Sequence, residues 1–226
     1  MSAAGERAVR LNADFALPVV IRPGDAPWVA SPLAGVERQM LDRVGEELAR
    51  ATSIVRYAPG SHFSAHGHPG GEEFLVLDGV FSDERGDYPA GTYVRNPIGS
   101  RHTPFSREGC TIFVKLMQFD AADRAEVVID SRRADWTPGA LPGQHELALH
   151  AFAGEQVRLQ RWAPDTVQAP QGYPGGAEFL VLEGSLQDER GVYPAGSWLR
   201  YPAQFSHSPG SAEGCLLWCK TGHLAP

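Results

Sequence analysis

Residues 66–79 read HGHPGGEEFLVLDG, and this stretch returns 105 positions later, at residues 171–184, as QGYPGGAEFLVLEG. The correspondence extends without a gap over residues 57–116 and 162–221, with 29 identities in the 60 aligned positions. Such a period is too long for a solenoid repeat. The sequence therefore predicts one domain present twice.

The chain has 226 residues, a length that accommodates two domains of ordinary size. We place the boundary in the polar, proline-rich stretch between the two copies. The predicted organisation is an N-terminal arm over residues 1–26, a first domain over residues 27–122 and a second domain over residues 123–226.

Each copy is predicted to consist of short strands. In the first copy, the apolar runs at Glu73–Leu77, Thr92–Arg95 and Thr111–Leu116 have strand length, and turns rich in Gly and Pro separate them. Short strands at regular spacing indicate an all-β sandwich or barrel.

The segment from Val36 to Ala51 is ambiguous, because its Glu, Arg, Leu and Met residues also suit an amphipathic helix. The corresponding segment of the second copy, Leu147 to Trp162, alternates in polarity and contains turn residues at Ala153-Gly154. This favours a hairpin, so we expect strands in both copies.

Four potential metal ligands lie in the first copy within a framework of spaced glycines: His66, His68, Glu72 and His102. Residues i and i+2 of a strand point to the same face, so both histidines of the His-x-His pair can point into a barrel. Glu72 follows a Gly-Gly turn that redirects its carboxylate. Three imidazoles and one carboxylate suit zinc, iron(II), manganese or nickel, and not calcium or magnesium.

Two neighbouring residues compete with this set. Glu73 adjoins Glu72, but the second copy keeps Glu178 for Glu73 while it has Ala177 for Glu72. Glu72 is absent from the second copy together with the two histidines, so we assign Glu72 as the ligand. Glu73 is retained, so we assign it a structural role. His62 is predicted to be a solvated histidine, the alternative being an outer-shell or substrate-facing group.

The second copy is predicted to hold no metal, because Gln171 and Tyr173 replace His66 and His68 and only His207 is kept. Its barrel then has either a filled core or a cavity for an organic ligand. We expect such a cavity to be lined by Tyr173, His207 and Trp198.

Composition excludes several classes of protein. The net charge is −7 and no basic stripe is present, so nucleic acid is not an expected partner. No apolar run approaches the ~20 residues that span a bilayer, and the N-terminus does not resemble a signal peptide. The three cysteines, Cys110, Cys215 and Cys219, are expected to be buried thiols in a cytoplasmic protein.

These motifs are similar to those of the cupin superfamily, and the wider sequence resembles the ChrR-like cupin family. The resemblance covers residues 30–118 closely and residues 136–222 in degenerate form. It implies two tandem double-stranded β-helix barrels of the jelly-roll type. It also implies that His66, His68, Glu72 and His102 hold one metal ion, usually zinc.

The family takes its name from an anti-sigma factor in which a zinc-binding helical domain precedes the cupin. Residues 1–30 are too few for that domain and contain no Cys or His, so direct binding of a sigma factor is not expected. The metal-binding barrel remains the expected feature, and a homodimer of such chains is compatible with the sequence.

Two functions follow from this resemblance. One is a regulatory or sensory module that responds to an oxidant or to a small ligand. The other is an iron(II)-dependent cupin dioxygenase that cleaves a small diketone or a hydroxyaryl ketone. For the enzyme, His62, Tyr93 and Arg95 are the positional candidates for substrate contact, although Arg95 returns as Arg200 in the second copy, which favours a structural role.

Overall fold

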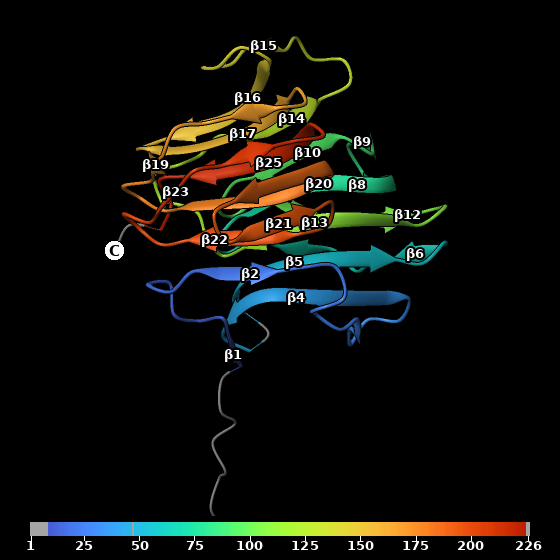
Figure 1. The fold of residues 1–226 in the computed structure, drawn as a ribbon. Coiled ribbons are helices and arrows are strands. Elements are labelled where there is room, and N and C mark those ends of the chain that lie inside the picture. The colour runs from blue at the N-terminus through green and yellow to red at the C-terminus, as the bar shows by residue number, and fades with distance from the viewer. Residues whose placement is uncertain (1–8, 47, 225–226) are drawn as a thin grey trace, which may run out of the picture. The chain divides into compact units, whose positions relative to one another are not determined.

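The computed structural model describes residues 9–46 and 48–224, and all its regular secondary structure is β-strand (Figure 1). Residues 1–8, which bear on the expectation about a signal peptide, lie outside this description. Within the described residues, no helix has the length and the apolar character to cross a membrane.

The chain divides into two compact units. One contains residues 27–128 together with the start of the chain, and the other contains residues 129–226 together with residues 14–26. Part of the N-terminal arm thus belongs to the second unit, where β2 (Val19–Ile21) pairs with β22 (Trp198–Tyr201).

The first unit is built on a sheet with the strand order β1-β4-β5-β13-β8-β10-β14; β3, β6, β9 and β12 join it at the side, and β7 and β11 form a separate pair. The strands are β1 (Arg10–Leu11), β3 (Val29–Ala30), β4 (Val36–Val44), β5 (Arg50–Tyr57), β6 (Ser61–His62), β7 (His66–Gly67), β8 (Glu72–Asp83), β9 (Gly86–Pro89), β10 (Thr92–Asn96), β11 (Arg101–His102), β12 (Phe105–Ser106), β13 (Cys110–Leu116) and β14 (Val127–Asp130).

The second unit repeats this plan with the order β15-β16-β17-β25-β20-β22-β2; β18, β21 and β24 join at the side, and β19 and β23 form the separate pair. Its remaining strands are β15 (Thr137–Pro138), β16 (Gln144–Phe152), β17 (Glu155–Trp162), β18 (Thr166–Val167), β19 (Gln171–Gly172), β20 (Ala177–Asp188), β21 (Gly191–Pro194), β23 (Ser206–His207), β24 (Gly210–Ser211) and β25 (Cys215–Thr221).

The ambiguous segment after Val36 forms strands, as expected. β4 and β5 pair from Val36 opposite Tyr57 to Val44 opposite Arg50. Pairing with a long neighbouring strand overrides the helix propensity of the Glu, Arg and Leu residues. The equivalent hairpin of β16 and β17 turns between Phe152 and Glu155, and it pairs from Gln144 opposite Trp162 to Phe152 opposite Glu155.

Both copies keep a glycine where the backbone of β8, or of its counterpart β20, closely approaches the carbonyl group of another glycine. Gly79 of β8 has φ 70°, and a Cβ atom there would lie 2.2 Å from the carbonyl oxygen of Gly109. Gly184 repeats both features, with φ 66° and a separation of 2.0 Å from Gly214. Only glycine fits this irregular crossing, which explains why both copies keep it.

Each unit has its own apolar core. The first is centred on Val55, Phe74, Phe81 and Ile112, and the second on Phe179, Leu186, Leu199 and Leu217. Cys110, Cys215 and Cys219 are buried free thiols, as the sequence indicated, and burial raises the pKa of Cys219 to about 12.

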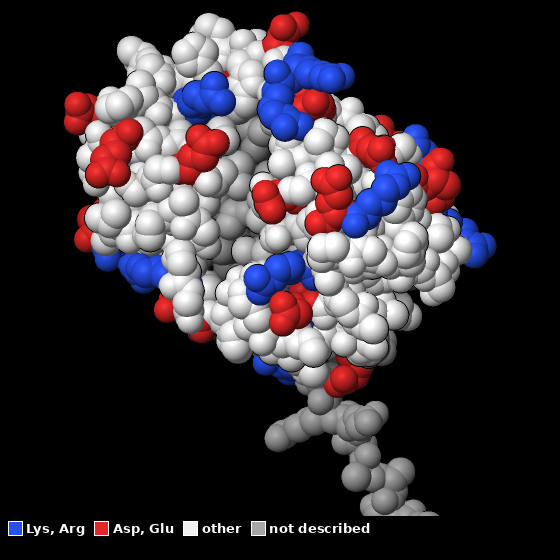
Figure 2. Space-filling model, turned by 90° about the vertical axis from the view of Figure 1, so that its right-hand side faces the viewer, with Lys and Arg blue, Asp and Glu red and all other residues white. Residues whose placement is uncertain are grey.

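Charges are mixed on the face drawn in Figure 2. The described Lys and Arg side chains lie there among Asp and Glu side chains, and no broad basic area forms on that face.

Candidate metal centre

The four predicted ligands come together in the first unit. His66 lies on β7 directly opposite His102 on β11, so the pairing of these two short strands sets their side chains together. His68 directly follows β7, and Glu72 is the first residue of β8. A ligand atom from each of the four lies within 4.8 Å of the others.

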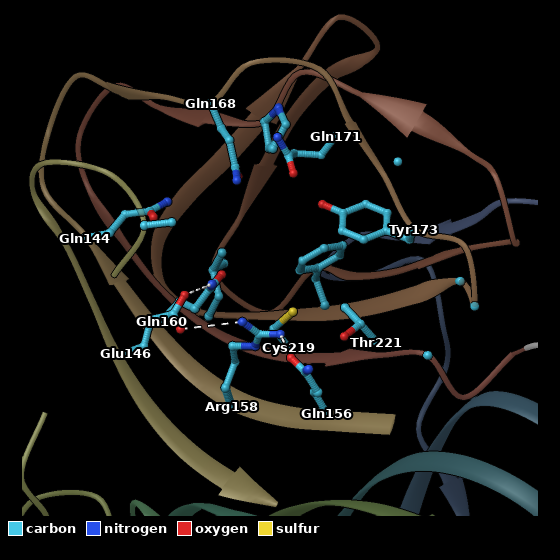
Figure 3. A pocket seen from close by; sticks show the side chains of 18 of the residues that line it. Gln144, Glu146, Gln156, Arg158, Gln160, Gln168, Gln171, Tyr173, Cys219 and Thr221 are labelled. Carbon is cyan, nitrogen blue, oxygen red and sulfur yellow. Dashed lines mark hydrogen bonds and ion pairs between the residues drawn. The ribbon is translucent and has the colours of Figure 1, made fainter. Parts of the chain in front are cut away.

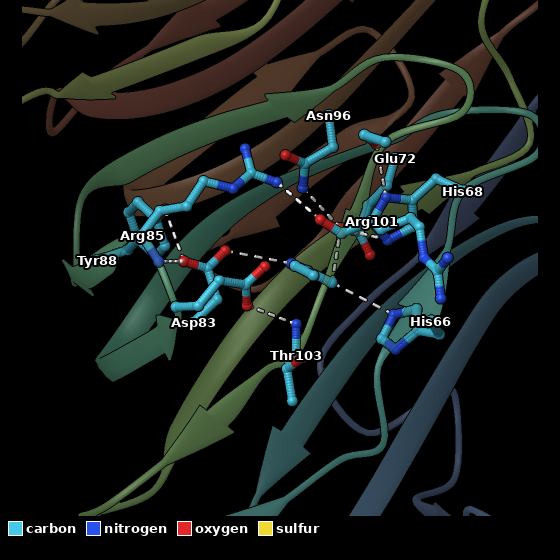
Figure 4. Close-up of polar contacts among 12 residues, drawn as sticks. His66, His68, Glu72, Asp83, Arg85, Tyr88, Asn96, Arg101 and Thr103 are labelled. Atoms are coloured by element: carbon cyan, nitrogen blue, oxygen red, sulfur yellow. Dashed lines mark hydrogen bonds and ion pairs between the residues drawn. The ribbon is translucent and has the colours of Figure 1, made fainter.

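The atoms that converge are Nε2 of each histidine and Oε2 of Glu72 (Figure 4). Nε2 of His66 lies 3.3 Å from Nε2 of His102. Oε2 of Glu72 lies 3.3 Å from Nε2 of His68 and 3.6 Å from Nε2 of His102. His68, Glu72 and His102 are buried, whereas His66 is exposed and forms the open side of the cluster.

The opposite ring nitrogens are held by oxygen atoms. Nδ1 of His66 lies 3.2 Å from the carbonyl oxygen of Ser64, and Nδ1 of His68 lies 2.9 Å from Oγ of Ser100. Since a carbonyl only accepts, Nδ1 of His66 carries the proton and Nε2 presents its lone pair to the cluster. Partners of this kind fix the orientation of histidine ligands in metal sites.

The other two members are oriented by the long central strands. Nδ1 of His102 lies 3.4 Å from Oδ2 of Asp83, at the far end of β8. Nδ2 of Asn96 donates a hydrogen bond of 3.0 Å to Oε2 of Glu72, from the position directly opposite on β10. Gly71, with φ 77°, makes the turn that brings the Glu72 carboxylate to this position.

Burial keeps two of the imidazoles neutral. The pKa of His68 is lowered to about 4 by burial, by the neighbouring His66 and by Arg85. The pKa of His102 is also lowered, chiefly by burial. Neutral imidazole is the form that binds a metal ion, so the environment prepares both rings for coordination at neutral pH.

These residues fit a transition-metal ion. Two donor atoms that each lie about 2.1 Å from one ion are about 3.0–3.4 Å apart at angles of about 90–110°, close to the separations observed here. Nε2 of His68 is buried and has no hydrogen-bond partner among the described residues. A buried polar atom without a partner is rare, and a bound metal ion accounts for it.

Glu73 has the structural role expected for it. Its Oε2 accepts a hydrogen bond of 2.6 Å from the hydroxyl of Tyr93 and lies 3.3 Å from Nη1 of Arg95. Arg95 also pairs with Asp123 and stacks on Phe119. Tyr93 and Arg95 of β10 thus belong to a buried polar cluster with Glu73 and Asp123. The structure does not place either residue as a substrate contact.

His62 lies apart from the four-residue cluster. It is exposed on β6 and stacks against Phe105, with ring centroids 5.7 Å apart. This agrees with the expected solvated histidine.

Sequence reasoning missed three orienting residues: Ser100, Asn96 and Asp83. Only Asp83 could have been found in the sequence. The second copy keeps it as Asp188, and each aspartate precedes its histidine, His102 or His207, by the same number of residues. Ser100 and Asn96 have no counterpart of the same type, and only the fold brings them to their partners.

In the second unit, other side chains fill the corresponding place. Nδ1 of His207 lies 3.0 Å from Oδ2 of Asp188, and Nε2 lies 3.0 Å from the hydroxyl of Tyr173. Gln171, at the position of His66, is bonded to backbone oxygens. Among the described residues, the one group suited to a metal ion is the cluster in the first unit.

The second unit does contain a cavity, but its lining differs in part from the expectation. Tyr173 lines it, as predicted. His207 and Trp198 are not among the lining residues, so that part of the prediction was wrong. Both are almost completely buried, His207 behind the hydroxyl of Tyr173 and Trp198 within the sheet on β22.

Comparison with known proteins agrees with this architecture. The model of the ChrR Cupin-like domain family matches the chain twice, over residues 17–120 and 124–225. A search among curated proteins finds no match.

Solved structures resemble the fold at low sequence identity. A candidate dioxygenase from Nostoc punctiforme PCC 73102 superposes with a TM-score of 0.78 at 14% identity, covering 93% of this chain and 85% of its own. The pirin YhhW from Escherichia coli, in complex with nickel(II), gives 0.63 at 12%, covering 91% and 98%. A salicylate 1,2-dioxygenase from Pseudaminobacter salicylatoxidans gives 0.63 at 11%, covering 95% and 86%.

Proposed function

Because this chain belongs to the ChrR Cupin-like domain family, in two tandem copies, we propose that its first barrel holds one divalent metal ion and acts as a regulatory or sensory module. The ligands are His66, His68, Glu72 and His102, and zinc is the proposed ion. When bound, the ion would supply a Lewis acid at this site.

The observation that carries this proposal is the convergence of three Nε2 atoms and one carboxylate oxygen, with the Nδ1 atoms facing outward. A site with four protein ligands resembles structural and regulatory zinc sites more than catalytic zinc sites, which have three protein ligands and an open position. A second barrel without such a ligand set also suits a module that senses or binds rather than two copies of an enzyme.

A second candidate is an iron(II)-dependent dioxygenase that acts on a small diketone or a hydroxyaryl ketone. The observation that favours it is the exposure of His66, which leaves one side of the cluster open to an incoming molecule. Two structures of similar fold carry dioxygenase names, although at their identity the likeness concerns the fold. The free, buried thiols agree with the cytoplasmic location proposed for either function.

The test is metal analysis of protein purified aerobically and anaerobically. One equivalent of metal is expected, lost in the His66→Ala/His68→Ala variant and kept in His207→Ala, which changes the histidine of the second barrel that corresponds to His102. Zinc in both preparations, without oxygen consumption when 2,4-pentanedione is added, supports the sensory module. Iron bound under anaerobic conditions, with oxygen consumption, supports the dioxygenase, and a metal-free protein contradicts both.

A further inference from the structure

A cavity of about 600 Å³ lies inside the second barrel (Figure 3). One wall is the inner face of β17, where every second residue lines the space: Gln156, Arg158, Gln160 and Trp162. Gln156 and Gly172 are exposed at its rim, so the cavity opens to solvent. Its volume lies in the range of small-molecule sites.

The first copy has mostly apolar residues at the equivalent positions. The replacements are Arg158 for Ser53, Gln160 for Val55, Gln168 for Phe63 and Thr221 for Leu116. Val55 belongs to the core of the first barrel, and Phe63 and Leu116 pack against that core. Amides stand here where the same fold otherwise has apolar core, and a guanidinium stands where it has a buried serine. Polar groups inside a barrel are costly unless they are hydrogen-bonded, so this interior favours a ligand that bonds to them.

The charge of the lining is balanced. Among the lining residues, Glu146 and Arg158 are the charged ones, and Nη1 of Arg158 lies 3.5 Å from Oε2 of Glu146. Arg158 also donates a hydrogen bond to Gln156, and Gln160 donates one of 2.7 Å to Oε1 of Glu146. Since the guanidinium and the carboxylate already neutralise each other, the cavity favours a neutral ligand over an anion or a cation.

Two buried donors at this cavity lack acceptors. Nε2 of Gln144 and Nε1 of Trp162 have no hydrogen-bond partner among the described residues, although these residues are only 3% and 4% exposed. Figure 3 shows the side chains of Gln144 and Gln168 extending from the wall into the open space. A buried N–H without an acceptor is costly, and a bound ligand that offers oxygen atoms removes that cost.

The remaining lining adds apolar surface. Trp162, Tyr173 and Phe179 present aromatic rings to the cavity beside the amides. Glutamine amides both donate and accept, as hydroxyl groups do, and aromatic rings pack against the C–H groups of a saturated ring. The combination fits a molecule with many hydroxyl groups on a compact carbon skeleton.

We propose that the second barrel binds a neutral, polyhydroxylated small molecule, a monosaccharide or a cyclic polyol, in this cavity. Gln144, Gln160 and Gln168 bind its hydroxyl groups, the pair of Glu146 and Arg158 binds two further oxygens, and the aromatic rings contact its carbon skeleton. The site is independent of the metal centre in the first barrel.

The experiment is saturation-transfer NMR on the full chain with a mixture of D-glucose, D-galactose, L-arabinose and myo-inositol, and in a second sample with citrate and benzoate. We expect transfer to at least one polyol and none to citrate or benzoate. The His66→Ala/His68→Ala variant should bind equally well, which separates this site from the metal site. Absence of transfer to every polyol, or transfer to the carboxylates instead, overturns the proposal.

Matched variants locate the binding. Arg158→Ser/Gln160→Val/Gln168→Phe installs the residues of the first barrel and should weaken polyol binding at least tenfold. The single variant Gln160→Val removes one hydroxyl partner, and it provides the test if the triple variant does not fold. Arg161→Ser, on the same strand but outside the cavity, should bind as the unmodified chain does. Unchanged binding by the folded cavity variants overturns the assignment.

Discussion

The hydroxyl oxygen of Tyr173 lies 3.0 Å from Nε2 of His207, the nitrogen that corresponds to the inward-facing atom of His102 in the first barrel. Because Nδ1 of His207 donates to Asp188, Nε2 of the neutral ring accepts from the tyrosine. A side chain that replaces a metal ligand thus satisfies the one ligand that is left. Both ring nitrogens of His207 are thus engaged in hydrogen bonds within the second barrel.

This relationship predicts that the second metal site can be restored. The variant Gln171→His/Tyr173→His/Ala177→Glu/Tyr201→Asn installs the ligands and the orienting asparagine of the first barrel on matching strands. We expect metal analysis to rise from one equivalent to two, because β19 pairs with β23 as β7 pairs with β11. A folded variant that still binds one equivalent contradicts this reading of the second copy.

The orienting hydroxyl of Ser100 should matter for metal affinity. Ser100→Ala removes the partner of Nδ1 of His68 and is expected to weaken metal binding by about 10–100-fold. Ser64→Ala is the matched control, since His66 contacts the backbone carbonyl of Ser64 and not its side chain. Competition with a chromogenic chelator measures both, and equal affinities would show that the Ser100 contact is incidental.

Substitutions at the adjacent residues Glu72 and Glu73 should have different effects, the first on metal binding and the second on stability. Glu72→Gln is expected to lose the metal. Glu73→Gln should keep the metal but lower the free energy of unfolding by about 3 kcal/mol, because it breaks a buried ion pair with Arg95. Metal analysis together with urea unfolding checks both variants; loss of metal in a folded Glu73→Gln protein would reverse the assignment.

Stability should fall in mild acid partly through His207. Burial lowers the pKa of His207 below its ordinary 6.5. At a pH between the pKa of His207 in the folded protein and 6.5, the unfolded chain binds the proton and the folded chain does not. The contribution of His207 to the free energy of unfolding is therefore fully present above pH 6.5 and is lost as the pH falls. The free energy of unfolding should therefore decline more steeply from about pH 7.5 to 5 in the unmodified chain than in His207→Gln. Parallel slopes in urea titrations would exclude this contribution.

The three thiols should resist alkylation in the folded protein. Burial raises the pKa of Cys110 and of Cys215 to about 11, and that of Cys219 to about 12. Very little thiolate, the reactive form, is therefore present at pH 8. Labelling with iodoacetamide, followed by mass spectrometry, should be slow without urea and complete with it, whereas rapid native labelling of any one thiol would show that it is accessible.

Much of the fold and of the metal cluster could be predicted from local features of the sequence. The strands and turns follow from short apolar runs and Gly-Pro punctuation, and the choice of Glu72 over Glu73 follows from their different fates in the second copy. The pocket lining was predicted less well. Tyr173 was placed correctly, but Trp198 does not line the cavity and instead stacks with Arg200, because the face on which a strand residue lies depends on register and bulges.

The sequence by itself determined that one domain occurs twice. It also determined that the complete set of four ligand-type residues occurs in the first copy alone, and that the second copy keeps one of the four. These are comparisons along the chain, and they need no knowledge of distance. Only the tertiary structure decided which nitrogen of each histidine faces inward, and that β2 completes the second sheet. Only the fold also gathered glutamines from β16, β17 and the loop after β18 around one cavity. Such contacts join residues far apart in sequence, and they are fixed by strand pairing across the barrel rather than by any local pattern.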